Sequence, residues 1–378
     1  MRVAFGTTVL ERGLAREAVD GIGNYSRELL DKLTGVSGVQ PIPFTYSRAD
    51  LRDAAQSGRL GLGPFGPQAL YSLATGLSFP IAKRRLFGRL DLVHATDHLI
   101  PSIRNLPVVA TLMDAIPLSH PEWVAYSFRN VKNAIWRKTA HWATHVITIS
   151  SHAKEELIEW FRLPEHRISV TPLGVDRRWF AFPSPFEVHR INVTYALPER
   201  FFLFVGTLQP RKNVARLIAA HRMLPMSLRK EYPLVVVGRA GWGCEGEVSA
   251  LEDGDGGALR WLRYVPESDL VTLVGRAAGL VFPSLHEGFG LPVLEAFAAG
   301  VPVIASNSTS LPEVAGDAAF LVNPERTDEL SDAMRELVGN SAVADRLRIA
   351  GRERAARFTW DHTTALTVKV YRQVLASF

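Results

Sequence analysis

Two glutamates around a glycine-containing turn form the segment of this sequence that is best suited to chemistry. Seven residues separate Glu287 from Glu295 in the run HEGFGLPVLEA. Gly288 and Gly290 let the backbone approach a ligand closely, and Pro292 occupies a position preferred at the start of a helix. The free N–H groups at such a helix start favour an anion such as a phosphate. The segment therefore suits a sugar nucleotide, with one glutamate on sugar hydroxyls and the other on ribose hydroxyls.

Glu295 stands alone as a charged residue in the helix expected over residues 293–299, which is otherwise apolar. A carboxylate on a buried helix is costly unless it is hydrogen-bonded or has a functional role. The alternative interpretation is a purely structural loop followed by a buried glutamate whose oxygens are satisfied within the protein.

Two adjacent cations, Arg211 and Lys212, follow a predicted strand and turn. Arginine offers a bidentate fork and lysine a point charge, so together they can neutralise a departing diphosphate. The alternative is a solvated basic pair at a helix start, which the helix dipole disfavours.

A second glycine pair, Gly21 and Gly23, precedes a helix predicted over residues 25–33. Such a pair can cradle an acceptor or a phosphate. An ordinary turn explains it equally well, since a Gly-x-Gly pair alone carries little information.

These segments resemble the signature of glycosyltransferase family 4, the large retaining group with the GT-B fold. In HEGFGLPVLEA the residues between the glutamates agree with the family as well as their spacing does. The runs GIGNY from Gly21, FVGTLQPRKN from Phe204 and VPESDL from Val265 follow in the expected order. They resemble the family's N-terminal glycine loop, donor-phosphate segment and base-contacting turn. The resemblance is strongest over residues 201–324 and points to bacterial mannosyl- or rhamnosyltransferases that build surface polysaccharides such as lipopolysaccharide.

The resemblance implies two sets of site residues. The catalytic set is Arg211, Lys212, Glu287 and Asp114. The donor-binding set is Gly206, Thr207, Val265, Leu270, Gly288, Phe289, Gly290, Leu291, Glu295, Gly21 and Gly23.

One position departs from the family pattern. A histidine after an N-terminal strand often lines the catalytic centre of these enzymes, but the matching run ATLMDAIP carries Met113 there. Asp114 beside it is expected to orient an acceptor or sugar hydroxyl. His94 and His98 are the alternatives, although packing explains each histidine alone more simply.

The resemblance also implies a mechanism. The acceptor hydroxyl attacks on the face that the diphosphate leaves, the phosphate accepts the proton, and the anomeric configuration is retained. No Asp-x-Asp run follows a predicted strand, so we expect metal independence, with Arg211 and Lys212 stabilising the leaving group. No cofactor is expected besides the donor substrate. A GDP-linked mannose or deoxyhexose such as rhamnose is expected as donor and a lipid-linked polysaccharide as acceptor. A UDP-glucose-dependent enzyme and a non-catalytic sugar-nucleotide-binding homologue are the alternatives.

The elements that must position these residues follow a repeated pattern of short apolar runs and helical segments. This alternation predicts two Rossmann-like α/β domains with parallel sheets facing a cleft. We place the N-terminal domain over residues 1–185 and the nucleotide-sugar domain over 186–361, with the proline-bearing stretch 180–200 as linker. The last helix, about 362–378, is expected to return to the N-terminal domain. The predicted strands are residues 3–7, 92–94, 107–112, 145–149, 167–170, 201–205, 234–237, 262–265, 279–282 and 301–305.

Charge and composition limit the location. The chain has 378 residues, one cysteine and a net charge of +5, and its longest apolar stretch is too interrupted to span a membrane. Basic residues stand beside aromatic and aliphatic ones at Lys83, Arg84, Arg85 and Arg89, and again over 129–138. This pattern suits an anionic membrane surface, with a solvated helix face as the alternative. We expect a cytoplasmic protein that docks peripherally on the inner face of the cell membrane.

Two other classes fit less well. A nicotinamide-dependent dehydrogenase should carry Gly-x-Gly-x-x-Gly directly after the first strand, but the pair at Gly21 comes late and Ser26 replaces the third glycine. A nucleic-acid reader should show a known module and a continuous basic stripe, and the sequence has neither.

Overall fold

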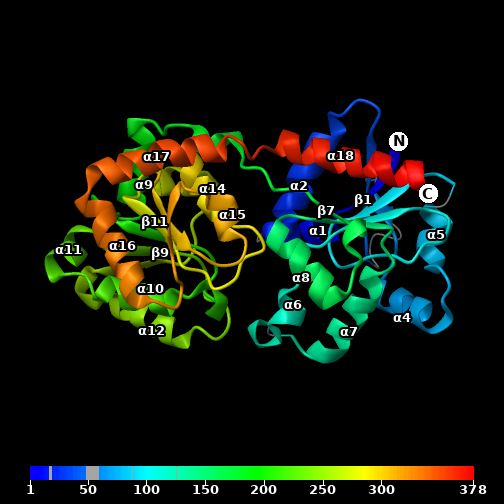
Figure 1. Ribbon diagram of the computed structural model, residues 1–378, viewed down its shortest axis with the longest axis horizontal. Helices are drawn as coiled ribbons and strands as arrows, with labels where there is room; N and C mark the ends of the chain where they lie inside the picture. The colour runs from blue at the N-terminus through cyan, green and yellow to red at the C-terminus, as the bar shows by residue number, and fades with distance from the viewer. Residues whose placement is uncertain (17–18, 48–58, 87, 125) are drawn as a thin grey trace. The chain divides into compact units, whose positions relative to one another are not determined.

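The computed structural model describes residues 1–16, 19–47, 59–86, 88–124 and 126–378 (Figure 1). Within these residues the chain divides into two compact units. The first comprises Met1–Gly174 and Trp360–Phe378, and the second comprises Val175–Thr359. Each unit has its own parallel sheet, as the alternating pattern predicts.

The sheet of the first unit has the strand order β3-β2-β1-β4-β5-β6-β7, and every pairing in it is parallel. The central strands are buried along their length, because helices cover both faces of such a sheet. The order reverses between β1 and β4, and ligands of doubly wound sheets bind beyond the carboxyl ends of strands at such a switch point. The strands are β1 (Arg2–Gly6), β2 (Gln40–Thr45), β3 (Leu60–Gly61), β4 (Leu92–Ala95), β5 (Val108–Thr111), β6 (His145–Thr148) and β7 (Ile168–Val170).

Two strands of this sheet, β2 and β3, are absent from the predicted set. Strand β2 reads QPIPFT, and prolines argue against a strand in sequence because they cannot donate to the ladder. The structure nevertheless pairs β2 with β1 along five residues. Strand β3 is too short to give a pattern.

The helices of the first unit include the last helix of the chain. They are α1 (Thr8–Ala15), α2 (Gly21–Thr34), α4 (Phe65–Thr75), α5 (Pro80–Leu86), α6 (Ile116–Ser119), η1 (Pro121–Trp123), α7 (Arg129–Ala140), α8 (Ser151–Phe161), η2 (Glu165–Arg167) and α18 (Trp360–Ser377). Helix α18 contacts α2, and the two lie side by side in Figure 1. Tyr371 of α18 makes a 2.6 Å hydrogen bond to Nδ1 of His94, so a buried polar contact ties this helix to β4.

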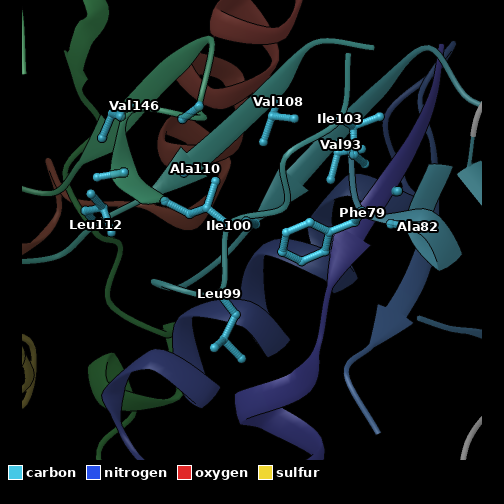
Figure 2. Close-up of a cluster of buried hydrophobic side chains, with 14 of the residues drawn as sticks. Phe79, Ala82, Val93, Leu99, Ile100, Ile103, Val108, Ala110, Leu112 and Val146 are labelled. Carbon is cyan, nitrogen blue, oxygen red and sulfur yellow. The ribbon is translucent and has the colours of Figure 1, made fainter. Parts of the chain in front are cut away.

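The core of the first unit lies between the sheet and the segments that follow β3. Figure 2 shows Phe79 and Ala82 near Val93 of β4, with Val108 of β5 in the same cluster. All four side chains are buried. Close packing of this kind fixes where α4 and α5 lie against the strands.

The second unit repeats the architecture with the strand order β10-β9-β8-β11-β12-β13, again with parallel pairings throughout. The switch point lies between β8 and β11. The strands are β8 (Phe202–Val205), β9 (Leu234–Val237), β10 (Leu259–Leu262), β11 (Gly279–Phe282), β12 (Val303–Ser306) and β13 (Ala319–Val322). The prediction of a strand at residues 262–265 was wrong, because β10 ends at Leu262, where that range begins. Strand β13 is absent from the predicted set.

The helices of the second unit surround this sheet. They are η3 (Arg177–Phe180), α9 (Pro185–Thr194), η4 (Pro210–Lys212), α10 (Val214–Arg222), α11 (Met226–Glu231), α12 (Glu245–Asp253), η5 (Gly254–Gly257), α13 (Glu267–Gly275), α14 (Leu291–Ala298), α15 (Leu311–Ala315), α16 (Thr327–Gly339) and α17 (Ser341–Ala355).

The units divide after Gly174, earlier than the predicted boundary at residue 185. The backbone N–H of Val175 donates to the carbonyl of Phe358 at 3.0 Å, and Trp179 is buried. The stretch 180–200 is also more than a linker, because it contains the capped helix α9. Arg190 of α9 donates to Asp269 of α13 at 2.8 Å, which holds this segment on the second unit.

Among the residues that the structure describes, none of the helices combines the length and apolar character needed to cross a membrane.

Candidate active site

Two cations and a carboxylate meet at the switch point of the second sheet. Arg211 and Lys212 lie in η4, on the loop that follows β8, and Glu287 lies on the loop that follows β11. The Lys212 Nζ is 2.5 Å from Oε1 of Glu287, and the Arg211 Nη1 is 3.1 Å from Oε2. The structure thus brings together three of the four predicted catalytic residues, from positions 75 apart in sequence.

This cluster is buried, which makes its electrostatics strong. The side chains of Lys212 and Glu287 are each only 10% exposed. Burial alone would raise the pKa of Glu287, but the charges of Lys212 and Arg211 outweigh it and hold the pKa at about 2. Burial lowers the pKa of Lys212, and the Glu287 carboxylate opposes that change. The cluster carries a net positive charge when all three groups are ionised, and it can therefore hold an anion.

Asn213, directly after the two cations, hydrogen-bonds their loop to the neighbouring loops. Asn213 has a left-handed backbone with φ of 59° and begins α10. Its Nδ2 donates to the carbonyl of Pro283 at 3.0 Å and to that of Pro324 at 2.8 Å. The backbone N–H of Leu285 donates in turn to the carbonyl of Arg211 at 2.7 Å. These bonds hold the loops after β8, β11 and β13 at the same end of the sheet.

Backbone conformation at Gly206 and close backbone approach at Gly238 favour glycine after β8 and β9. Gly206 follows β8 with φ of 153°. A Cβ on Gly238, which follows β9, would lie 2.0 Å from the Gly206 carbonyl oxygen, so only glycine fits there. Thr207 beside it is exposed.

The turn HEGFG is built as the sequence predicts, with a glycine at the point of greatest constraint. Gly290 has φ of 112° and is the N-cap of α14, whose first turn contains Pro292. A Cβ on Gly290 would lie 2.6 Å from Cδ2 of Leu311. Gly288 and Phe289 are buried beside it, and Leu291 begins the helix.

Two hydroxyls that the sequence reasoning missed hold this turn. The Ser310 Oγ donates to the carbonyls of Glu287 and Phe289, at 2.8 and 2.9 Å. The Thr309 Oγ1 accepts from the backbone N–H of Glu287 at 3.1 Å. The run STSLPE contains them, but a short serine- and threonine-rich loop is too common in sequence to indicate a role.

Glu295 lies on α14, and its pKa is shifted in the direction opposite to that of Glu287. Burial raises the pKa of Glu295 to about 7. The positive charge of Arg178 opposes the increase, whereas the negative charges of Glu267 and Asp176 add to it. The two glutamates of the signature therefore differ in charge below about pH 7. Among the described residues, cations form salt bridges with Glu287 and not with Glu295.

The predicted base-contacting turn joins β10 to α13. Val265 is buried and Leu270 is half-buried on the first turn of α13. Asp269 between them accepts from Arg190 at 2.8 Å and from the Tyr195 hydroxyl at 2.7 Å. Helix α9 thereby fixes the position of the turn.

The predicted glycine loop of the first unit is part of a helix. Gly21 and Gly23 lie in the first turn of α2, which begins earlier than the predicted range 25–33. The Asp20 carboxylate caps this helix by accepting from the Gly23 N–H at 2.8 Å. A carboxylate at this helix start occupies a donor that a phosphate would otherwise use. Contact of Gly21 and Gly23 with an acceptor or a phosphate stays a prediction.

The departure from the family pattern at Met113 lies just beyond β5. Asp114 beside it accepts from the backbone N–H of Ile116 at 3.2 Å, which shapes the turn before α6. His94 makes a 2.8 Å hydrogen bond to Thr111, and burial lowers its pKa to about 3, so its ring is neutral and structural. The ring of His98 packs against Trp136, with centroids 4.3 Å apart.

Comparisons with known proteins agree across the chain. A family model described as Glycosyltransferase Family 4 matches residues 19–179, and one described as glycosyl transferases group 1 matches residues 187–354. The O-antigen chain mannosyltransferase B of Escherichia coli is 31% identical over 390 residues, covering 98% of this chain and 100% of that protein. The glycogen synthase of Mycobacterium tuberculosis is 31% identical over 297 residues, covering 75% of this chain and 69% of that protein.

A solved structure shows the same fold. Sucrose-phosphate synthase from Thermosynechococcus elongatus matches with a TM-score of 0.75 at 22% identity, and the match covers 100% of both chains.

Proposed function

The chain belongs to glycosyltransferase family 4 and has the GT-B fold, and from this premise we propose that it moves a hexose from a nucleotide diphosphate to a glycan acceptor with retention of configuration. The observation that carries the proposal is the cluster of Arg211, Lys212 and Glu287 at the switch point of the second sheet. Doubly wound sheets bind nucleotides at this place.

The cations are proposed to act on the leaving group. As the bond to the sugar breaks, negative charge develops on the diphosphate, and buried cations stabilise it without reorganising. Lys212 and Arg211 contact Glu287 through their charged atoms, so an entering diphosphate competes with that carboxylate for them. Glu287 is then released toward a sugar hydroxyl. We propose that this arrangement replaces a divalent metal ion.

The transfer itself requires no nucleophile from the protein. The acceptor oxygen forms its bond to the anomeric carbon on the face from which the diphosphate oxygen departs. The acceptor proton passes to that phosphate oxygen. The protein positions the two substrates, for which Glu295 holds the ribose and Asp114 orients a hydroxyl.

A GDP-linked mannose is the proposed donor. The full-length relative is named a mannosyltransferase of the O-antigen chain, which supports mannose and a surface polysaccharide acceptor. The match to a glycogen synthase supports a glucosyl donor such as UDP-glucose as the second candidate. A GDP-deoxyhexose is included in the proposal because its nucleotide and diphosphate present the same contacts.

The acceptor is proposed to be lipid-linked and reached at the cytoplasmic face of the membrane. Lys83, Arg84 and Arg89 are exposed and form what we call the basic segment. Arg85, also predicted to belong to it, is half-buried and donates to the carbonyl of Gly61 at 2.8 Å. Each exposed cation near an anionic leaflet contributes about 1 kcal/mol, so three can give reversible docking.

A donor panel tests the proposed function. The purified protein is incubated with GDP-mannose, GDP-rhamnose or UDP-glucose, with and without a mannose oligosaccharide, and released nucleotide diphosphate and product are measured. Acceptor-dependent release from GDP-mannose and an α-linked product are expected, because GDP-mannose is an α-glycoside. Binding without turnover for every donor would favour a non-catalytic homologue, and an inverted product would refute retention.

A further inference from the structure

The first unit contains an apolar pocket that the proposed transfer does not use. It has a volume of about 450 Å³, within the range of small-molecule sites. Helix α4, the residues after β4 and the region of α7 surround it. Its lining is predominantly apolar and includes Phe65, Leu70, Leu99, Tyr126, Ile135 and Trp136.

The polar side chains of the pocket lining are few. The ring of His98 contacts that of Trp136 at an interplanar angle of 50°, and the Lys132 Nζ lies 4.9 Å from the centroid of the Tyr126 ring. Lys132 lines the pocket and is exposed, so its charge is accessible from solvent. A sugar would leave most of its hydroxyls without partners in such a lining, which is costly, whereas a hydrocarbon requires none.

The segments that supply the pocket lining also expose apolar side chains. Leu70 on α4 is 59% exposed, Phe128 directly before α7 is 81% exposed, and Val131 on α7 is 59% exposed. Large apolar side chains that are exposed on neighbouring segments indicate contact with an apolar partner.

The charge of the surrounding segments is of one sign. Residues 126–140 contain no acidic residue, and α4 contains no charged residue at all. Four exposed basic side chains lie on α7: Arg129, Lys132, Arg137 and Lys138. Basic residues beside exposed apolar ones match the surface of an anionic lipid bilayer.

We infer that the pocket between α4 and α7 binds the hydrocarbon chain of an anionic lipid, while Lys132 and its basic neighbours on α7 contact the lipid headgroup. The exposed apolar side chains then enter the interface of the bilayer. This inference rests on the proposed membrane docking in one respect, because the membrane is taken as the source of the lipid. It is independent of which sugar is transferred. It differs from the basic segment on α5, which offers charge without a pocket.

Quenching by brominated lipid tests the inference directly. Vesicles of phosphatidylglycerol with bromine on the acyl chains are added to the protein without any sugar nucleotide. Bromine quenches tryptophans that it contacts, so Trp136→Phe should remove most of the quenching. Trp142→Phe serves as the control, because Trp142 packs against Phe79 in the core. Equal quenching in wild type and Trp136→Phe would overturn the inference.

Two matched glycine variants test the pocket without removing an aromatic ring. Gly66 lines the pocket at the second position of α4, Gly246 takes the second position of α12, and a Cβ at either glycine meets nothing within 4 Å. Glutamate is favourable in the first turn of a helix, so both variants should fold, and both change the net charge equally. Gly66→Glu should weaken binding to the vesicles at least about tenfold, because it places a carboxylate at the pocket, whereas Gly246→Glu should bind as wild type does.

The outcomes separate this inference from the proposed function. Loss of lipid binding in Gly66→Glu, with nucleotide-sugar hydrolysis intact, supports the pocket. Binding by Gly66→Glu equal to that by Gly246→Glu would overturn it. Capture of another protein at this site without any quenching by the brominated chains would likewise overturn it. Neither result depends on whether the chain transfers mannose.

Discussion

Replacing Glu295 with glutamine should stabilise the protein at alkaline pH while weakening its function. The pKa of Glu295 is raised to about 7 from an ordinary value of 4.5, mainly by burial. At low pH the carboxyl group is protonated in both the folded and the unfolded chain and has no effect on the difference. As pH rises from 4.5 to 7, the unfolded chain releases this proton and the folded chain still holds it, so stability falls.

The size of the effect follows from the pKa difference. Since each pKa unit corresponds to about 1.4 kcal/mol, a carboxyl group shifted this far costs roughly 3 kcal/mol above its folded pKa. Most of that cost develops between about pH 5 and about pH 8, over which wild type should lose roughly 2–3 kcal/mol relative to Glu295→Gln. The glutamine side chain does not titrate, and all other titrating groups are shared by the two proteins.

Urea unfolding of wild type and of Glu295→Gln at about pH 5 and about pH 8 measures the effect. The quantity of interest is how much the difference in unfolding free energy between the two proteins changes with pH. Glu287→Gln is the matched control, because the pKa of Glu287 is held at about 2 and its carboxylate is ionised throughout this range. That variant should be less stable than wild type at both pH values, because it leaves the buried Lys212 without its carboxylate partner. A stability difference between wild type and Glu295→Gln that does not change with pH would refute the raised pKa of Glu295. Donor affinity of the glutamine variant should fall, since an amide offers one acceptor to the ribose where a carboxylate offers two.

Three further predictions concern the leaving group, the turn and the membrane. Arg211→Ala and Lys212→Ala should each lower kcat by roughly 10²–10³. EDTA should leave the wild-type rate unchanged. A rate abolished by chelation and restored by Mg²⁺ would contradict the metal-free mechanism. Gly290→Ala should lower the thermal midpoint, because its φ of 112° and the 2.6 Å approach of a Cβ to Leu311 both oppose a side chain; an unchanged midpoint would show that the turn relaxes. Neutralising all three cations of the basic segment should reduce co-sedimentation with anionic vesicles. Added salt should have the same effect on wild type, because the Debye length is about 8 Å at physiological ionic strength. Equal sedimentation of wild type and the neutralised variant would show that the basic segment has no part in docking.

The sequence predicted the two parallel sheets because each depends on a local signal that repeats along the chain. Short β-branched runs such as LVVV at Leu234 give a fully buried strand wherever helical segments separate them. The same reasoning missed β2, because its two prolines argue against a strand. Strand β2 forms through its pairing with β1, and the sequence of β2 alone does not reveal that pairing. It also placed the domain boundary too late, because Trp179 and α9 attach to the second unit through residues far along the chain.

Residue types and spacing in HEGFGLPVLEA and in QPRKN were sufficient to predict Glu287, Glu295, Arg211 and Lys212 as candidate site residues of the second unit. This is possible because such a turn constrains its own backbone, with glycine and proline at fixed positions. Only the tertiary structure decided how these groups are charged. The Lys212 Nζ and a Glu287 carboxylate oxygen come together at 2.5 Å, which keeps that carboxylate ionised. Glu295 is half-buried and forms no salt bridge within the described part of the chain, and desolvation raises its pKa to about 7. Charge state depends on burial and on distances through space, and neither is written in the order of residues along a loop.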